Sequence, residues 1–157
     1  MTDHEKFMRM AIALSRENVR SGAGGPFGAV VVKDGEVIGR GANRVTSGND
    51  PTAHAEVVAI RDACKALGTF SLAGCDIYSS CEPCPMCFAA IYWARIGKIY
   101  CGNTLQDAAD IDFDDALLYT QVALPKEKRS IPLIPLLRSE ALAAFEEWRN
   151  KTDKAPY

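Results

Sequence analysis

Short apolar runs alternate along this chain with longer stretches of helical period, and this alternation constrains the fold more than any other feature. A β-branched run over 27–32 precedes Asp34 and Gly35, a dipeptide that predicts a tight hairpin turn. Further strand-like runs cover 75–80 and 98–102, with helix-like stretches before each. Strands that alternate with helices favour parallel pairing by right-handed crossovers. The predicted class is therefore α/β, with helices covering both faces of the sheet.

Proline positions mark several predicted boundaries. Asp50-Pro51 is typical of an N-cap followed by proline at the first helical position, and Glu82-Pro83 marks the start of an apolar helix that continues through Ile96. An apolar run over 131–137 is interrupted by prolines, so we expect an edge strand there rather than a central one.

Length and charge narrow the function classes. A chain of 157 residues that is 48% hydrophobic predicts one domain over 1–157. Its apolar stretches fall short of the ~18–20 residues of a membrane-spanning helix, and the polar opening residues do not resemble a signal peptide, so we expect a cytoplasmic protein. A net charge of −2 argues against a nucleic-acid partner and favours a small molecule.

One histidine and two cysteines have the spacing of a metal site. Six cysteines in a reducing compartment do not predict a disulfide framework. His54, and about thirty positions later Cys84 and Cys87, offer three good zinc ligands, each expected in the first turn of a helix. Three protein ligands leave the fourth tetrahedral position to water, as in catalytic zinc sites. The positive helix ends there would favour thiolates. We therefore expect one Zn²⁺ per subunit.

Glu56 follows His54 by two residues, so on a helix the two side chains point in different directions and Glu56 would be a poor fourth ligand. A carboxylate leaning over the open position can take a proton from zinc-bound water and return it to a substrate nitrogen. Glu56 is therefore the predicted general base.

Cys81, Cys84 and Cys87 also have the spacing that opens a bacterial iron–sulfur run. That run needs a further cysteine followed by proline, and Ile91 and Tyr92 occupy those positions. Cys81 is therefore expected to be a packed thiol at the end of a strand.

The His54-x-Glu56 and Pro83-Cys84-x-x-Cys87 motifs resemble those of the zinc-dependent nucleoside and nucleobase deaminases. Segments in the order typical of that family cover roughly the first hundred residues: Gly25–Val32, Asn43, Asp50–Glu56 and Ser80–Cys87. Within the family, further segments are similar to the short bacterial guanine deaminases: Ile91–Arg95, Phe113–Asp115, Trp148–Asn150 and Tyr157. The resemblance implies a three-layer α/β/α cytidine-deaminase-like fold with a central five-stranded mixed sheet. It also implies hydrolysis of guanine, a small-molecule purine, to xanthine and ammonia.

The resemblance implies roles outside the metal site as well. Asn43 would bond the substrate, Phe27 would stack on the purine, and main-chain groups near Ala55 would hold its polar edges. Asp115 would assist the loss of ammonia, with Asp114 as a competitor for that role. Two plainer interpretations stay open, namely that Asn43 is a turn residue and that Phe27 belongs to the core.

In the guanine deaminases the C-terminal segment crosses to the partner subunit and covers its active site. The resemblance therefore implies a homodimer in which 152–157, including Tyr157, form a swapped lid; a frayed terminus is the alternative. Three rival functions stay open: a tRNA-specific adenosine deaminase, a deaminase of another purine-like base, and a zinc-binding module without chemistry. The negative net charge disfavours the first, and a three-ligand zinc set beside Glu56 disfavours the last.

Overall fold

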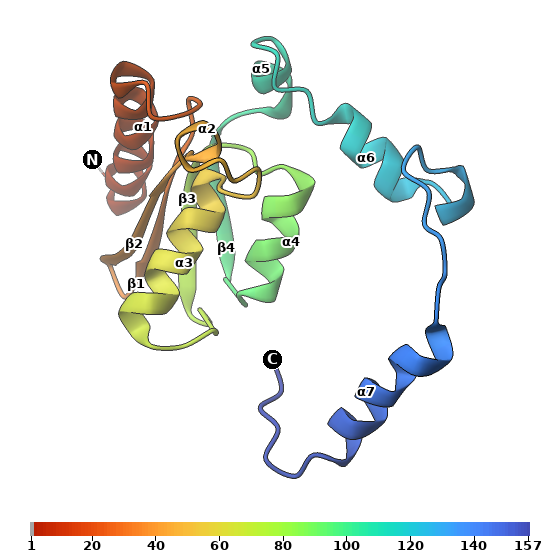
Figure 1. The fold of residues 1–157 in the computed structure, drawn as a ribbon. Coiled ribbons are helices and arrows are strands. Elements are labelled where there is room, and N and C mark those ends of the chain that lie inside the picture. Colours follow the sequence, from red (N-terminus) through yellow and green to blue (C-terminus); the bar gives the residue numbers. More distant parts are fainter. Residues whose placement is uncertain (1) are drawn as a thin grey trace. The chain divides into compact units, whose positions relative to one another are not determined.

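The structure is a computed structural model that describes residues 2–157 of the chain. It divides into two units, Met1–Asp115 and Ala116–Tyr157 (Figure 1). The first unit holds the sheet and all residues of the candidate site except Tyr157. None of the helices formed by the described residues has the length and hydropathy needed to cross a bilayer.

The first unit is built on a mixed sheet of four strands in the order β2-β1-β3-β4. These are β1 (Gly28–Lys33), β2 (Glu36–Ala42), β3 (Cys75–Cys81) and β4 (Lys98–Asn103). The predicted hairpin joins β1 to β2, and both turn residues, Asp34 and Gly35, have positive φ. Paired positive φ values match the twist of the flanking strands, which is why this dipeptide makes a tight turn.

The prediction of five strands is wrong for the described residues. The segment 131–137 forms no strand, and its apolar side chains are exposed. Pro132 and Pro135 lack backbone N–H groups, so this segment cannot donate a regular ladder of hydrogen bonds.

The expectation of parallel pairing holds for only one pair of neighbours. β3 and β4 are parallel, whereas β1 is antiparallel to both β2 and β3. β2 and β3 do run in the same direction, but the hairpin strand β1 lies between them. The crossover from β2 to β3 therefore spans two strand positions, an arrangement that alternation along the chain does not reveal.

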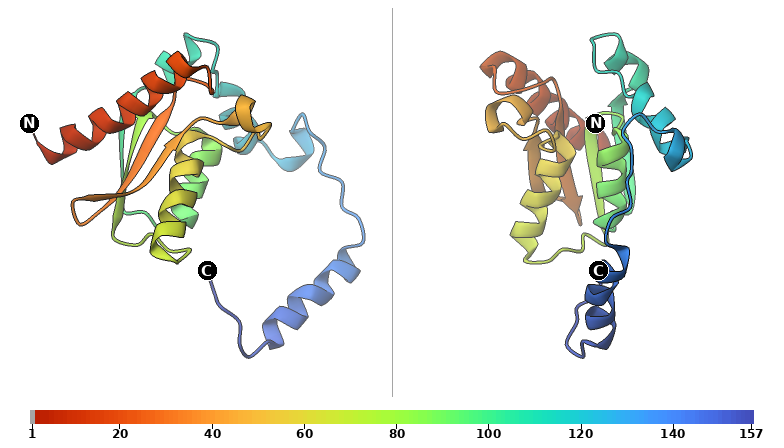
Figure 2. Two further views of the ribbon diagram at one scale, coloured as in Figure 1. Left: turned by 60° about the vertical axis from the view of Figure 1, so that its left-hand side comes forward. Right: turned by 45° about the vertical axis from the view of Figure 1, so that its right-hand side comes forward.

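Helices cover both faces of this sheet, as predicted. α1 (Asp3–Ser21) lies on one face, and α3 (Ala55–Leu67) and α4 (Pro85–Trp93) lie on the other (Figures 1 and 2). Successive residues of β1 point to opposite faces. Val30 and Val32 pack with Phe7 and Ala11 of α1, whereas Ala29 and Val31 pack into the core beneath α3 and α4.

Close packing of α3 on β2 fixes where the start of that helix lies. Ala55, Ala59 and Ala63 recur every fourth residue and are fully buried. A side chain at Gly41 would clash with the carbonyl oxygen of Ala55, and one at Gly39 would clash with that of Ala59. Small residues on both surfaces thus let the helix backbone rest directly on the strand, which holds its N-terminus at the end of the sheet.

The second unit contains α6 (Ala116–Ala123), a short 3₁₀ helix (Lys126–Lys128) and α7 (Arg138–Asn150). None of its residues is buried. Large apolar side chains, among them Val122, Ile134, Leu136 and Phe145, are at least two-thirds exposed. This segment therefore has no core of its own.

Candidate metal centre and active site

The three predicted ligands lie at the N-termini of two neighbouring helices. His54 is the N-cap residue of α3, Cys84 is the N-cap residue of α4, and Cys87 lies in the first turn of α4. We expected all three within the first turn; the helices instead begin one residue after His54 and one after Cys84. His54 and Cys84 still lie at the positive ends of their helix dipoles, and a thiolate such as that of Cys84 is favoured there.

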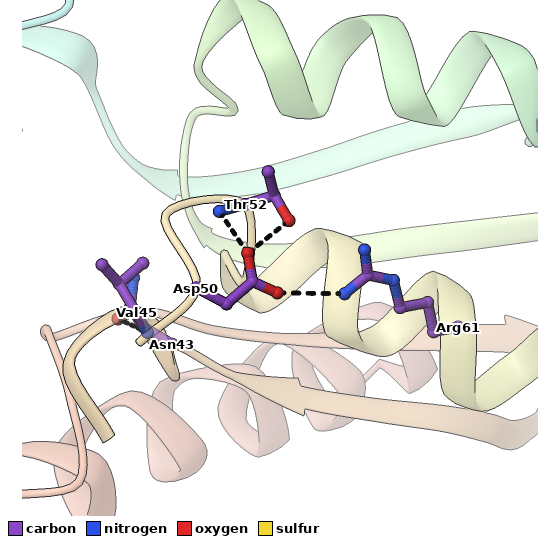
Figure 3. Close-up of polar contacts among 5 residues, drawn as sticks. All are labelled: Asn43, Val45, Asp50, Thr52 and Arg61. Carbon is purple, nitrogen blue, oxygen red and sulfur yellow. Dashed lines mark hydrogen bonds and ion pairs between the residues drawn. The ribbon is translucent and has the colours of Figure 1, made fainter. Parts of the chain in front are cut away.

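The segment before α3 differs from the N-cap predicted at Asp50. The carboxylate of Asp50 accepts hydrogen bonds from the backbone N–H and the hydroxyl of Thr52, at 2.8 and 2.6 Å (Figure 3). Its other oxygen lies 3.7 Å from the guanidinium of Arg61 on α3. Asp50 therefore stabilises a turn rather than the helix start. That turn leads directly into His54, whose N–H donates to the Thr52 carbonyl at 2.8 Å.

The geometry of the three side chains fits a tetrahedral zinc ion. Nδ1 of His54 lies 3.5 Å from the Sγ atom of Cys84 and 3.5 Å from that of Cys87. All three ligand atoms lie within 4.8 Å of one another. Zn–S bonds of about 2.3 Å and a Zn–N bond of about 2.0–2.1 Å, at tetrahedral angles, separate sulfur from nitrogen by about 3.5–3.6 Å. The nitrogen–sulfur distances therefore match those expected around a single zinc ion.

The electrostatic environment favours a thiolate at this cluster. Hydrogen bonds from Cys87 and His54 lower the pKa of Cys84 to about 4, against the opposing effect of burial. The pKa of Cys87 is raised because its thiol proton bonds to Cys84 and because the residue is buried. The thiolate is the form that binds metal, so Cys84 carries the charge of a ligand at neutral pH.

Glu56 lies beside the cluster but is not part of it. Its side chain is only 6% exposed, and its Oε1 accepts a hydrogen bond of 3.2 Å from the hydroxyl of Ser79 on β3. Burial raises the pKa of the Glu56 carboxyl. A carboxyl group that holds its proton more readily than usual, next to an open metal position, is suited to proton transfer.

A cavity of about 220 Å³ opens beside these groups. This volume is below the ~300–1,000 Å³ typical of sites for drug-sized ligands, so it suits a small ring. The predicted residues Phe27, Asn43, His54, Glu56, Cys84 and Asp115 line the cavity, together with Gly25, Val45, Thr46, Cys81, Glu82, Ala108 and Phe113.

Residues 1–103 match the model of the cytidine and deoxycytidylate deaminase zinc-binding region. The chain belongs to this deaminase family. Along 155 residues it is 50% identical to guanine deaminase from Bacillus subtilis (strain 168), which covers 99% of each chain. It is also 47% identical over 102 residues to the tRNA-specific adenosine deaminase of Agrobacterium fabrum (strain C58), covering 65% of this chain and 66% of the other.

Solved structures agree with this assignment. The X-ray structure of guanine deaminase from Bacillus subtilis superposes with a TM-score of 0.96, covering 100% of this chain and 99% of that one. A guanine deaminase from Nitrosomonas europaea is 32% identical, with a TM-score of 0.67 over 90% of this chain and 82% of that one. The deaminase fold therefore extends from the zinc-binding region into the C-terminal third of the chain.

Asn43 of this deaminase is a turn residue, one of the two interpretations that its sequence position left open, and it also lines the cavity. Its Oδ1 accepts a hydrogen bond from the N–H of Val45 at 3.1 Å (Figure 3). The same oxygen accepts a hydrogen bond from the N–H of Gly25 at 3.3 Å, so Asn43 does stabilise a turn. Because both acceptor sites of the amide oxygen are used, the Nδ2 group is the end of Asn43 available to a ligand in the cavity.

Two aromatic rings form part of the cavity wall of the deaminase. Phe27 and Phe113 lie edge to face, with centroids 4.9 Å apart and planes at 87°. A Cβ atom at Gly25 would lie 3.3–3.4 Å from both rings, so a side chain there would crowd them. Phe113 was not predicted as a site residue, although its place in the Phe113-Asp114-Asp115 motif was a usable signal. Burial, followed by the charge of Cys84, raises the pKa of Asp115.

Three predicted or discussed residues lie elsewhere or play another part. Ala55 does not line the cavity, since its side chain is fully buried under β2. Tyr157 belongs to the second unit and is exposed. Cys81 is buried, lines the cavity, and donates its S–H to the carbonyl of Thr104 at 3.6 Å; burial raises the pKa of this thiol to about 11. Cys81 is therefore a neutral thiol beside the metal cluster.

Proposed function

We propose that this deaminase hydrolyses guanine to xanthine and ammonia, as a step in purine breakdown. The observation that carries the proposal is one small cavity whose wall holds His54, Cys84 and the buried carboxyl of Glu56. The likeness to guanine deaminase over 99% of the chain supports guanine as the substrate. A structural zinc module would close the metal with four protein ligands, whereas the cluster here has three.

The proposed chemistry divides between the metal and two carboxyl groups. When bound, zinc lowers the pKa of a coordinated water to about 7 and so supplies a nucleophile at neutral pH. Glu56 accepts a proton from the attacking water while the oxygen of that water forms a bond to C2 of guanine. Glu56 then delivers that proton to ring N3, which leaves C2 tetrahedral with both a hydroxyl and the amine attached.

Release of ammonia needs a second proton. The hydroxyl proton on C2 is transferred to the exocyclic amine, and we assign Asp115 to assist this transfer. The C2–N bond then breaks, ammonia leaves, and the C2 carbonyl of xanthine forms. A raised pKa in Asp115 supports this role, because the carboxyl can hold a proton during the transfer.

Binding of the base is assigned to the walls of the cavity. Phe27 offers an aromatic face for stacking, and Asn43 offers N–H donors for an acceptor atom of the purine. The side chain of Ala55 is fully buried, so the contact assigned to this position is made by the main-chain groups near Ala55, which hold a polar edge of the purine.

A tRNA substrate is the main alternative and is less well supported. The likeness to a tRNA-specific adenosine deaminase is confined to 102 residues, 65% of this chain. The second unit, where the likeness to guanine deaminase continues, carries only a small excess of positive charge, with seven basic and five acidic side chains, and the net charge of the whole chain is −2. A tRNA-binding protein depends on such charge to neutralise phosphates.

We further propose that the protein is a homodimer and that residues 152–157, with Tyr157, cover the active site of the partner subunit. The second unit supports this because it exposes large apolar side chains and buries none. Burying such a side chain contributes about 1.5–3 kcal/mol. On α4, Phe88, Tyr92 and Trp93 are also exposed and offer a second surface for association. All six cysteines are free, which supports a cytoplasmic location.

One substrate panel tests the proposed activity. Ammonia release is measured from guanine, guanosine, adenine, cytosine, cytidine and a tRNA anticodon arm, with zinc content determined on the same preparation. We expect guanine to be the preferred substrate. Protein that holds a full equivalent of zinc but releases no ammonia from guanine would contradict the proposal.

Mixing two inactive or weakened variants tests the swapped lid. Glu56→Gln keeps the C-terminal segment but lacks the base, and a deletion of 152–157 keeps the base but lacks the segment. If the segment acts on the partner, mixed dimers regain activity at one of their two sites. Activity that stays at the sum of the two separate variants, in samples shown to exchange subunits, argues against the swap.

A further inference from the structure

Asn18 is a buried polar residue of α1 that the proposed chemistry does not use. Its side chain is 2% exposed and continues a buried stripe of α1 formed by Phe7, Ala11 and Ser15. An apolar residue would be expected at such a position. Asparagine has a lower helix propensity than most apolar residues and must have its buried amide satisfied, so its presence needs a physical reason.

Hydrogen bonds connect the Asn18 amide to two segments of the cavity wall. Its Nδ2 donates to the carbonyl of Gly25 at 2.8 Å and to the carbonyl of Asn43 at 2.9 Å. Its Oδ1 accepts a hydrogen bond from Nη1 of Arg44. Both donors and the acceptor of this amide are therefore engaged, which fixes its orientation.

The two segments held by Asn18 are those that orient the Asn43 side chain. The N–H of Gly25 and the N–H of Val45 both donate to Oδ1 of Asn43. Asn18 thus holds Asn43 in two ways. It donates directly to the backbone carbonyl of Asn43, and it donates to the carbonyl of Gly25, the residue whose N–H donates to the side-chain oxygen of Asn43. With its oxygen held in this way, Asn43 directs its N–H donors to a ligand in the cavity.

Packing leaves little room for this arrangement to relax. A side chain at Gly24 would clash with the carbonyl of Asn43 and would lie 3.0 Å from Nδ2 of Asn18. The N–H of Arg44 donates to the carbonyl of Ala53 at 2.9 Å, which connects the same network to the residue before His54. Loss of the Asn18 amide would remove one donor from each of two backbone carbonyls where these segments meet. The Gly25 carbonyl would keep only the Phe27 N–H, and the Asn43 carbonyl only the long bond of 3.4 Å from Nη1 of Arg44.

We infer that Asn18 is a positioning residue for substrate binding, which orients Asn43 through Gly25 and thereby sets the hydrogen-bond donor that the cavity presents to the purine. The inference rests on the proposed function, since it assumes that Asn43 contacts the base. It makes Asn18 act through Asn43 and not through the metal cluster or Glu56.

The principal test substitutes Asn18→Leu, which keeps the approximate size of the side chain and removes every hydrogen bond. We expect the KM for guanine to rise about tenfold or more, as for the loss of one well-placed hydrogen bond, with kcat within about threefold of the wild type. Zinc content should not change. Ser15→Ala is the matched control, because Ser15 lies on the same buried stripe and its hydroxyl donates to the Ile12 carbonyl of its own helix rather than to the cavity wall.

Two further measurements separate positioning from a general loss of stability. In an Asn43→Ala background, Asn18→Leu should leave KM unchanged, because nothing remains for Asn18 to position. Hydrogen exchange at the amides of Gly25 and Val45 should speed up at least about tenfold in Asn18→Leu but not in Ser15→Ala. Arg44→Met, at an exposed position, should show the same changes more weakly and serves if Asn18→Leu does not fold.

The outcomes distinguish this inference from the proposed function. If the wild-type protein releases no ammonia from guanine, the proposed function fails, and the exchange measurement still decides whether Asn18 holds the Asn43 turn. If exchange and KM in Asn18→Leu and Arg44→Met match those of Ser15→Ala, the inference is wrong. It is also wrong if Asn18→Leu raises KM by the same factor whether Asn43 is present or replaced by alanine.

Discussion

Replacing Glu56 with glutamine tests the proposed mechanism most directly. Glutamine has nearly the same shape, and its side-chain oxygen can still accept the hydrogen bond from Ser79 that Glu56 accepts at 3.2 Å. The change therefore creates no cavity and leaves the metal cluster with its three ligands. What it removes is the group that can accept and return a proton.

The expected loss follows from the number of proton transfers assigned to Glu56. A positioned general acid or base contributes typically about 10²–10⁴-fold to the rate of the step it serves. Glu56 serves two transfers, from water and to N3, and it is only 6% exposed, so bulk water cannot readily replace it. We therefore expect Glu56→Gln to lower kcat by about 10⁴-fold, with unchanged zinc content.

Ammonia release under saturating guanine gives kcat, and metal analysis on the same sample gives the zinc content. Asp62→Asn is the control: it lies on the same helix, is exposed, and accepts a hydrogen bond from the N–H of Arg40, outside the cavity. It should keep kcat within about threefold of the wild type. A Glu56→Gln protein within tenfold of the wild type would refute the assignment, and one that loses its zinc would show that Glu56 is a ligand.

Other expected outcomes concern the metal ligands, the C-terminal segment, the cavity wall and the buried Tyr78. Cys87→Ser should lower both zinc content and ammonia release, and a chelator should do the same to the wild type; retained zinc would exclude Cys87 as a ligand. Deleting 152–157 should lower kcat/KM without lowering Tm, whereas unchanged kinetics would indicate a frayed terminus. Phe27→Leu should raise KM several-fold by removing about 0.5–1.5 kcal/mol of aromatic contact, and an unchanged KM would place Phe27 in the core only. Burial raises the pKa of Tyr78 to about 12, so its phenol ionises at higher pH in the folded than in the unfolded chain. The free energy of unfolding should therefore be unaffected below about pH 10 and should decline toward pH 12. Denaturation midpoints should show a smaller decline in Tyr78→Phe.

Much of the site could be predicted from the sequence because its key residues carry their chemistry locally. His54, Cys84 and Cys87 are zinc-ligand types at a recognisable spacing, and the structure places their ligand atoms within 4.8 Å of one another. Phe27, Asn43, Glu56 and Asp115 all line the same cavity. Their individual roles in catalysis and binding stay predictions until the variants above are measured.

Other parts of the cavity could not be predicted because they depend on contacts between distant segments. Phe113 lies edge to face with Phe27, more than eighty residues earlier in the chain. The Asn43 amide is oriented by Gly25, and Gly25 by Asn18. The one available signal for Asn18 is a polar residue on the buried stripe of a helix.

The sequence by itself determined the α/β class, the hairpin at Asp34-Gly35 and the metal ligand set, since each rests on short-range periodicity, on the backbone preference of a dipeptide or on ligand chemistry. Only the tertiary structure decided that β1 lies between β2 and β3 and that the sheet of the described residues has four strands. Periodicity reports which residues face the core but not which strand is the neighbour. Neighbours are chosen by packing across the whole sheet, where the small residues of β2 and α3 let the helix rest on the strand and bring His54 to Cys84 and Cys87.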